Sequence, residues 1–372
     1  MFSGKKECGY GKVPPIGVIL VNLGTPDAPT KKALKPYLKE FLADPRVIEK
    51  PRWLWWIILN CFILPFRPKK SAELYKQVWT KEGSPLLVYS QKQKEKLEQK
   101  LTEYYASPCK VALGMSYGNP SVKSALEELR NAGCRKVVFL SLFPQYSATS
   151  SATAYDAIMR VFLRWRWIPD LRTITSYHDH PLYINALANS IRKSWQEKGK
   201  SEKLLFTFHG IPLQYFLDGD PYHCLCHKTA RLVAEELELK AEEYIVTFQS
   251  IFGRDRWLEP ATDKTMEKLG SEKLSSLTVI CPGFISDCLE TLEEIEGENK
   301  EIFQHAGGGE FRYVPCLNDS EDCIDLLFEL IKENSHGWLI DKQNWDQPAV
   351  DREVNASKCA YEKLAKVTTN KT

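Results

Sequence analysis

Eight short apolar runs, separated by turns and by segments of helical pattern, recur along the chain. The first, IGVILVNL (Ile16–Leu23), is apolar almost throughout, which is typical of a strand covered on both faces of a parallel sheet. The other predicted strands are Lys110–Met115, Lys136–Leu142, Leu171–Ser176, Leu204–Phe208, Glu243–Phe248, Leu277–Ile280 and Phe311–Val314. The helices predicted around them are Lys31–Leu42, Val88–Tyr105, Ser121–Ala132, Tyr183–Glu197, Thr229–Leu237, Thr262–Leu269 and Asp287–Ile295. This alternation predicts an α/β fold of two similar Rossmann-like halves, each with a four-stranded parallel sheet flanked by helices.

The order of these elements predicts where the chain divides. Strands one to four lie within residues 1–180 and strands five to eight within residues 181–337, so we expect two halves of similar architecture, although no repeat is visible at the level of residues. The predicted helix at Tyr183–Glu197 would link them. Residues 338–372 are polar, and only Val354–Lys366 is weakly amphipathic, which predicts a C-terminal extension.

A histidine follows the fifth predicted strand directly. The apolar run LLFTF leads into His209-Gly210-Ile211-Pro212, and open α/β sheets bind ligands at the carboxyl ends of their strands. Gly210 lets the backbone turn and Pro212 fixes it, so the imidazole is held on a stiff corner. His209 is therefore either an ordinary strand-end side chain bonded to a backbone carbonyl or a functional group at a ligand-binding edge.

Acidic residues follow the seventh predicted strand, in CPGFISDCLETLEEIEGE (Cys281–Glu298). Asp287, Glu290 and Glu294 are spaced i, i+3, i+7, so they would form one stripe along a helix. Such a stripe can simply be a solvent-exposed face. However, this helix and the His209 corner both leave the carboxyl ends of strands, so we expect them to face one cleft. An imidazole opposite carboxylates suits proton transfer and the binding of iron(II), and crowded carboxylates raise one another's pKa.

The segment WLWWIILNCFILPF (Trp53–Phe66) is rich in tryptophan and lies between basic residues. These are Lys50, Arg52, Arg67, Lys69 and Lys70. At fourteen residues the segment is shorter than the ~18 that a membrane-spanning helix needs. It is either a buried core helix or an amphipathic anchor that places aromatic rings at the level of the lipid headgroups and basic side chains on their phosphates.

Composition narrows the function further. The 372 residues are 43% apolar and 26% charged, as in ordinary soluble proteins. The net charge of +2 gives no electrostatic reason to expect nucleic acid as a partner. Eleven cysteines scattered singly through the chain indicate reduced thiols in a cytosolic protein. No GxGxxG or GxxxxGK motif follows a predicted strand, which argues against a nucleotide-dependent enzyme.

Six motifs together resemble ferrochelatase, from about Pro15 to about Gly337. They are FTFHGIP with GDPY after it, FQSIFGRDRWLEP, CPGFISDCLETLEEI, VNLGTPDAP, RPKKSAELY and FPQYSATSSA. The resemblance implies a chelatase-like fold and a lyase that inserts ferrous iron into protoporphyrin IX. The products would be protohaem and two protons, in the terminal step of haem biosynthesis. The resemblance also favours residues 53–66 as a lip over the active-site mouth. The expected location is therefore the cytoplasm, with peripheral contact to the inner membrane.

The resemblance also implies roles for individual residues. His209 and Glu290 would be the catalytic pair and the metal ligands, with Asp287 and Glu294 continuing as a relay for protons or metal. Porphyrin contacts would come from two groups of side chains. The apolar slot would be formed by Leu23, Tyr117 and Trp257, and the candidates for meeting the porphyrin carboxylates are Arg67, Lys70, Tyr75 and Ser84.

Four positions depart from the family pattern. Ser116 stands where arginine is usual, and Ile251, Arg256 and Ala261 replace the usual arginine or lysine, proline and tyrosine. These departures leave two alternatives open. One is a haem or porphyrin carrier without turnover, and the other is a chelatase for another metal or macrocycle, such as cobalt or coproporphyrin. The loop at Gly24 lacks the tyrosine of many coproporphyrin-type relatives, which favours protoporphyrin.

A cluster of soft metal ligands occurs in PYHCLCHK (Pro221–Lys228). Its spacing is too tight for a standard structural zinc site. Some ferrochelatases carry an iron–sulfur cluster on four cysteines, in several of them near the C-terminus, whereas only Cys359 lies in this tail. We therefore expect no iron–sulfur cluster and no tightly bound cofactor, with Fe²⁺ acting as substrate.

Overall fold

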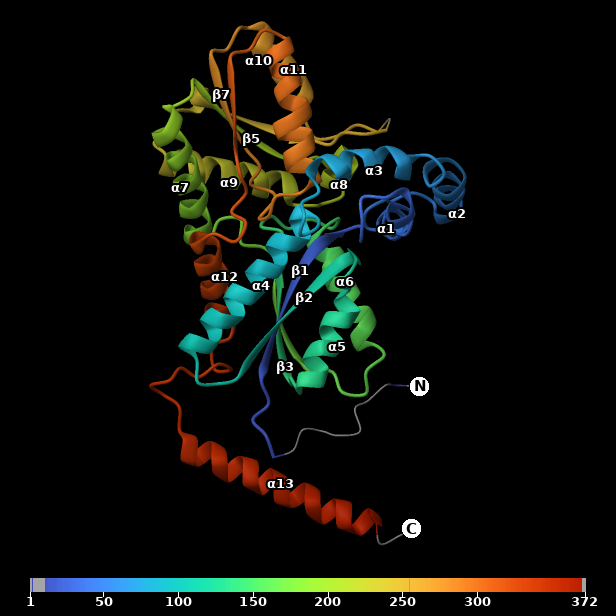
Figure 1. Ribbon diagram of the computed structural model, residues 1–372, viewed down its shortest axis with the longest axis vertical. Helices are drawn as coiled ribbons and strands as arrows, with labels where there is room; N and C mark the ends of the chain where they lie inside the picture. Colours follow the sequence, from blue (N-terminus) through green and yellow to red (C-terminus); the bar gives the residue numbers. More distant parts are fainter. Residues whose placement is uncertain (1, 3–10, 254, 370–372) are drawn as a thin grey trace.

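Two parallel four-stranded sheets form the framework of the protein in the computed structural model, which describes residues 2, 11–253 and 255–369 (Figure 1). The first sheet has the order β2-β1-β3-β4 and the second β6-β5-β7-β8. Their strands are β1 (Ile16–Thr25), β2 (Cys109–Gly118), β3 (Lys136–Ser141), β4 (Asp170–Ile174), β5 (Lys203–His209), β6 (Tyr244–Gln249), β7 (Ser276–Ile280) and β8 (Glu310–Val314). Every strand coincides with a predicted apolar run, so the predicted fold class is confirmed.

The helices lie on both sides of these sheets. Those before β5 are α1 (Lys31–Ala43), α2 (Arg52–Ile57), the π-helix η1 (Ile58–Ile63), α3 (Arg67–Val78), α4 (Pro85–Tyr104), α5 (Val122–Ala132), α6 (Ser151–Phe162) and α7 (Pro181–Lys198). Those after β5 are α8 (Leu213–Leu217), α9 (Tyr222–Glu236), the 3-10 helix η2 (Ala241–Glu243), α10 (Thr262–Ser271), the π-helix η3 (Glu290–Asn299), α11 (Lys300–His305), α12 (Glu321–Asn334) and α13 (Gln347–Thr369).

Two helices tie the halves of the chain together. Helix α7 packs against α9 and β8 of the second sheet, whereas α12, although it follows β8, packs against α4, β3 and β4 of the first. One hydrophobic core therefore contains buried residues of both sheets, such as Leu20 and Phe208, together with Leu327 of α12. In Figure 1 both helices lie at the same side of the molecule, where the two sheets meet. The division at residues 180 and 337 remains a prediction.

The carboxyl end of β1 lies unusually close to its neighbour. Gly24 has a φ of +111°, and a Cβ atom at this position would lie 1.8 Å from the backbone oxygen of Tyr117 on β2. Only glycine allows both this φ and this approach. The end of β1 that carries Leu23 is thereby held against β2, at the sheet edge where ligands bind in such folds.

The chain after α12 is fastened to the first half before α13 begins. The Arg172 guanidinium donates to the carbonyls of Asn334 and His336, at 2.9 Å each, and lies 4.1 Å from the ring centroid of Trp338. Helix α13 includes the predicted Val354–Lys366 helix but is longer, and it lies apart from both sheets at the bottom of Figure 1.

Candidate active site

A cavity lies between the two halves at the carboxyl ends of their strands. It is partly open to solvent. The first half contributes Leu23, Tyr37, Tyr75 and Ser84 to its lining, and the second half contributes the segment from Gly283 to Glu290, except Asp287. Three predicted substrate contacts, Leu23, Tyr75 and Ser84, are therefore brought together with Glu290.

His209 ends β5 in a half-buried position. Its Nδ1 lies 2.7 Å from the carbonyl oxygen of Gly210. Because a carbonyl can only accept, Nδ1 carries the hydrogen, and in the neutral ring Nε2 keeps its lone pair. A Cβ on Gly210 would lie 2.9 Å from the Gln249 carbonyl and 3.2 Å from the Trp257 ring, so the corner is tightly packed. The backbone bond of an ordinary strand-end histidine is thus present, and it leaves the other nitrogen basic.

The acidic segment differs from the prediction. It forms the π-helix η3 from Glu290 to Asn299 rather than an α-helix from Asp287 to Ile295. Asp287 lies in the loop before η3, so the predicted stripe of three carboxylates is wrong and only Glu290 and Glu294 belong to the helix. A π-helix has i→i+5 hydrogen bonds, is rare, and occurs frequently at functional sites.

Glu294 connects the two predicted catalytic residues. Its Oε1 accepts from the backbone N–H of Ser250 at 2.7 Å, and its Oε2 accepts from the Ser250 hydroxyl at 2.5 Å. Ser250 follows β6 with a φ of +62°, a strained conformation that persists only where surroundings enforce it. Burial raises the pKa of Glu294 and the charge of Glu290 raises it further, while the Ser250 bonds and His209 lower it. Glu294 is thus within electrostatic reach of both His209 and Glu290.

Gln249 joins the strand beside His209 to the backbone of Glu290. It is the register partner of His209 on β6, and its Nε2 donates to the Glu290 carbonyl at 3.0 Å. Its Oε1 accepts from the hydroxyl of Thr207 at 3.0 Å, which fixes the amide orientation. The sequence analysis missed Gln249; a polar residue ending a buried strand next to His209 was the available signal.

Asp287 is enclosed by hydrogen-bond donors. It is 3% exposed, and its Oδ1 accepts from the Tyr313 hydroxyl at 2.6 Å and from the Thr291 hydroxyl at 3.1 Å. Its Oδ2 accepts from the Asn318 amide at 2.6 Å. A carboxylate with these partners is fixed in place. The relay role expected of Asp287 remains a prediction.

Two predicted wall residues are buried and lie outside the cavity lining. Tyr117 is 4% exposed and packs on Phe41 with ring centroids 5.2 Å apart. Trp257 is 9% exposed and packs on Phe252 at 4.7 Å. Neither belongs to the cavity lining. Arg67 is exposed and lies 5.5 Å from the Phe252 ring centroid, so it extends the same aromatic group towards solvent.

Tyr37 is a lining residue that sequence reasoning missed. Its hydroxyl donates to the Gly24 carbonyl at 3.1 Å, which supports the β1 corner. Burial, together with the charge of Glu290, raises the pKa of Tyr37 and also that of Tyr75. Both phenols stay protonated at neutral pH, so beside Glu290 they can donate hydrogen bonds but cannot act as bases. Tyr37 lies in a helix of ordinary apolar spacing, and no sequence signal distinguished it.

The cysteine–histidine cluster on α9 does not converge. Cys226 is buried in the core, whereas His223 and His227 pack on each other with ring centroids 4.4 Å apart and on Phe248. Within residues 11–253 and 255–369, no group of three or more His, Cys, Asp or Glu side chains is arranged to hold a metal ion. The arrangement of these side chains does not support a zinc site on α9.

Replacing Glu294 with glutamine is expected to change how stability depends on pH. Because burial raises the pKa of Glu294 in the folded state, folding favours its protonated form. That stabilisation is complete below the ordinary pKa of 4.5 and is lost as the pH rises through the raised value. Each unit by which the pKa of Glu294 is raised lowers the free energy of unfolding by about 1.4 kcal/mol at higher pH. Glu294→Gln has no carboxyl to ionise and avoids this loss.

Thermal unfolding at pH 5, 6, 7 and 8 measures this effect. The difference in unfolding temperature between Glu294→Gln and the unaltered protein should grow in favour of the variant as the pH rises. Glu298→Gln, at an exposed position of the same π-helix, is the matched control and should give a constant difference. A difference that stays constant for Glu294→Gln too would contradict the raised pKa.

Comparison with known proteins agrees with the motifs. A family model for ferrochelatase matches residues 15–335. A ferrochelatase of Thioalkalivibrio sulfidiphilus is 52% identical over 357 residues, which are 96% of this chain and 97% of that protein. A ferrochelatase of Idiomarina loihiensis is 51% identical over 91% of this chain and 93% of its own length. Among solved structures, SirB from Bacillus subtilis with Fe³⁺ covers 88% of this chain and 99% of its own. Its TM-score is 0.51 at 12% identity, a likeness of fold alone.

Proposed function

Because the chain belongs to the ferrochelatase family, whose members are metal chelatases that insert iron into porphyrin in haem biosynthesis, we propose that His209 and Glu290 perform this insertion together. The observation that carries the proposal is Gln249, which is the register partner of His209 on β6 and donates to the Glu290 carbonyl at 3.0 Å. This link supports one site for the imidazole and the carboxylate, although they come from different βα units. The porphyrin we propose is protoporphyrin IX.

Insertion requires two pyrrole N–H protons to leave and ferrous iron to lose its waters. The lone pair on Nε2 of His209 and the carboxylate of Glu290 are the basic groups that accept protons or ligate the incoming metal. Tyr37 and Tyr75 remain protonated beside Glu290, so neither competes with it for protons. Glu294, with its raised pKa, passes protons outward from the pair. No tightly bound cofactor is needed, and iron is the substrate.

The cavity lining provides the proposed porphyrin contacts. Leu23 and Tyr75 form the wall on the first half, and Ser84, whose hydroxyl accepts from Thr25 at 2.8 Å, lies beside them. Arg67, exposed over Phe252, is positioned to meet a propionate carboxylate. Tyr117 and Trp257, which are buried in this structure, remain proposed contacts of the macrocycle. The wall strains the bound ring toward a puckered form that exposes its nitrogens.

An anoxic assay with iron(II) and protoporphyrin IX tests the proposal. Multiple turnovers are expected from the purified protein, with a large loss in variants of His209 and Glu290. A porphyrin carrier would instead bind the ring without catalysing insertion, so tight binding without turnover would overturn the proposal.

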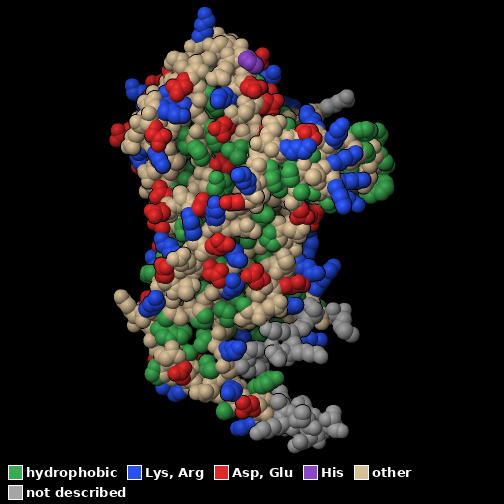
Figure 2. Space-filling model, viewed as in Figure 1, with side chains coloured by type: hydrophobic (Ala, Val, Ile, Leu, Met, Phe, Trp, Pro, Cys, Tyr) green, Lys and Arg blue, Asp and Glu red, His purple; other side chains and the backbone are tan. Residues whose placement is uncertain are grey.

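We also propose that the Trp53–Phe66 segment contacts the cytoplasmic face of the inner membrane. Six of its large side chains are 40–73% exposed: Trp53, Leu54, Trp56, Ile57, Phe62 and Phe66. This exposure excludes a buried core helix, although Leu59 and Leu64 anchor the segment inward. Figure 2 shows hydrophobic side chains on the projecting lip beside Lys and Arg side chains. Among the described helices, none is both long and apolar enough to cross a bilayer.

Replacing Trp53, Trp56 and Phe62 together with serine is expected to release the protein from vesicles that contain phosphatidylglycerol. Burial of each such side chain contributes on the order of 1.5–3 kcal/mol, so the bound fraction should fall by at least about tenfold. Co-sedimentation with vesicles measures this. A matched control replaces Leu163 and Trp167, which are 72% and 53% exposed elsewhere. Unchanged binding in the lip variant, or equal loss in the control, would contradict a specific membrane contact.

A further inference from the structure

We propose that Gln93 is a positioning residue that fixes Glu290 relative to the opposite cavity wall. Gln93 lies on α4 of the first half and is fully buried, with 0% exposure. Its Nε2 crosses to the second half, where it donates to the Asn318 carbonyl at 2.6 Å and to the Ser286 hydroxyl at 3.0 Å. The inference rests on the proposed catalytic role of Glu290.

Asn318 passes this constraint on to the loop before Glu290. It has a φ of +51°, and its backbone N–H donates to the Ile285 carbonyl at 2.8 Å. Its side-chain oxygen accepts from the Asp287 backbone N–H at 2.8 Å, and its side-chain nitrogen donates to Asp287 Oδ2 at 2.6 Å. Because Thr291 also donates to Asp287, the first turn of η3 is bound to the same group. Glu290 lies within that turn, between Asp287 and Thr291.

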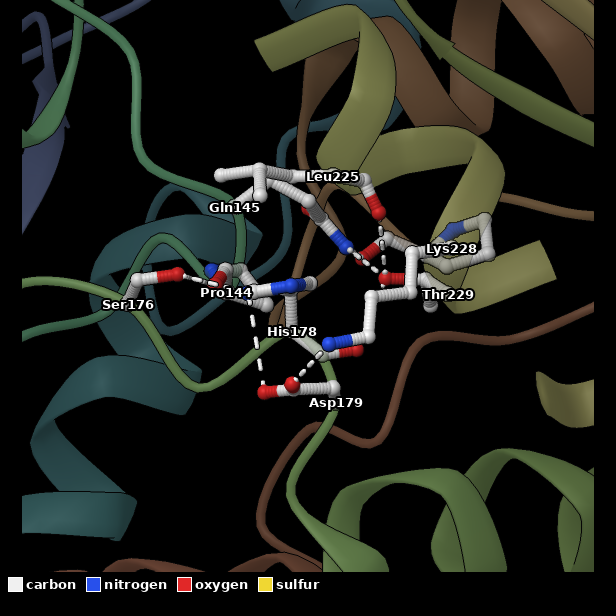
Figure 3. Close-up of polar contacts among 9 residues, drawn as sticks. Pro144, Gln145, Ser176, His178, Asp179, Leu225, Lys228 and Thr229 are labelled. Atoms are coloured by element: carbon white, nitrogen blue, oxygen red, sulfur yellow. Dashed lines mark hydrogen bonds and ion pairs between the residues drawn. The ribbon is translucent and has the colours of Figure 1, made fainter. Parts of the chain in front are cut away.

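The beginning of the same loop is held by a second amide from the first half. Gln145 is 1% exposed, and its Nε2 donates to the Pro282 carbonyl at 3.3 Å and to the Thr229 hydroxyl at 3.0 Å. Figure 3 shows Gln145 directed at Thr229 of α9, next to the ion pair between Asp179 and Lys228. The Tyr183 hydroxyl donates to the same Pro282 carbonyl. Residues 282–287 are therefore fixed at both ends by groups outside their own βα unit.

The contacts of Gln93 and Gln145 affect the cavity because its walls come from the two different halves of the chain. Leu23 and Tyr75 belong to the first half and Glu290 to the second, so the width of the cavity depends on contacts that cross between them. A displacement of about 1 Å at a reacting group can reduce a rate by up to about 10²-fold. Gln93 forms such a crossing contact and reaches Glu290 through Asn318 and Asp287. This gives Asp287 a structural part in the site.

Steady-state kinetics of Gln93→Met tests the proposal. Methionine keeps the length and volume of the side chain but cannot donate hydrogen bonds. We expect kcat for iron insertion to fall by about tenfold, with KM for porphyrin changed by less than about twofold, because the wall stays intact while Glu290 shifts. The matched control is Gln99→Met on the same helix, where the exposed Gln99 donates only to Glu103, and its kcat should be unaltered.

A double variant separates positioning from general loss of structure. If Gln93 acts through Glu290, Gln93→Met should cause little further loss when it is added to Glu290→Gln. Additive losses, or a normal kcat in Gln93→Met, would overturn the inference.

If Gln93→Met does not fold, a second variant tests the same link. Asn318→Gly keeps the left-handed backbone and removes both side-chain bonds to Asp287, so its kcat should also fall by about tenfold. A normal rate in Glu290→Gln alone would refute the proposed role of Glu290, whereas a slow Glu290→Gln with a normal Gln93→Met would refute only this inference.

Discussion

Iron insertion is expected to fall by roughly 10²–10⁴-fold when His209 is replaced by alanine, because the substitution removes the basic Nε2 at the end of β5. The loss should appear in kcat, since the cavity lining does not include the imidazole and porphyrin should still bind. Anoxic turnover measures the first effect. Quenching of intrinsic protein fluorescence by added porphyrin measures the second.

The control for His209→Ala is an imidazole of the same half that lies away from the cavity. His227 on α9 is exposed and packs on Phe248, so His227→Ala should keep normal turnover. If His209→Ala also kept normal turnover, the assignment of the base and metal ligand to the β5 corner would be wrong. Loss of porphyrin binding together with turnover would point to a collapsed corner instead, which thermal unfolding of the variant would reveal.

Glu290→Gln is expected to slow insertion by about 10²-fold or more. Glutamine has the same shape and keeps the backbone carbonyl that accepts from Gln249, so the π-helix should remain in place. What is lost is the negative charge beside Tyr37, Tyr75 and Arg67, together with the ability to accept a proton. Initial rates at several iron(II) concentrations distinguish weaker metal binding from slower chemistry.

A neighbouring carboxylate provides the comparison for Glu290→Gln. Glu293 lies on the same π-helix outside the cavity lining, and Glu293→Gln should lower the rate by less than about twofold. If Glu290→Gln were nearly as fast as the unaltered protein, the role would move to Glu294, the other carboxylate within reach of His209. The pair of variants therefore assigns the function to one position of the helix.

The sequence predicted the two sheets well because their inner strands, β1, β3, β5 and β7, are apolar runs that are buried almost throughout. Ile16–Leu23 and Leu204–Phe208 could be recognised from composition alone, and the turns after them placed Gly24 and His209 at the correct edge of each sheet. These features depend on local sequence. The position of the candidate site was predictable for the same reason.

The features that could not be predicted from the sequence depend on contacts between residues that are distant in the chain. Nothing in DCLETLEEI distinguishes a π-helix from an α-helix, and the helix makes contacts with distant partners, such as Gln249 at the end of β6 and Ser250 directly after it. Tyr117 and Trp257 end or follow strands as expected, but whether such a ring faces the cavity or the core depends on packing. Gln93 finds its partners more than 190 residues away and could not be identified from sequence.

The common connectivity of the two sheets has a consequence for how such a site can evolve. Each sheet begins with an inner strand, adds the next strand on one side and places the following two on the other. The corner that carries His209 in the second sheet therefore corresponds to the Leu23–Gly24 corner in the first. In a homodimer of identical units, a substitution at this corner would appear on both walls at once. Two such units within one chain can differ at this corner, so that one presents a reactive side chain and the other an apolar surface.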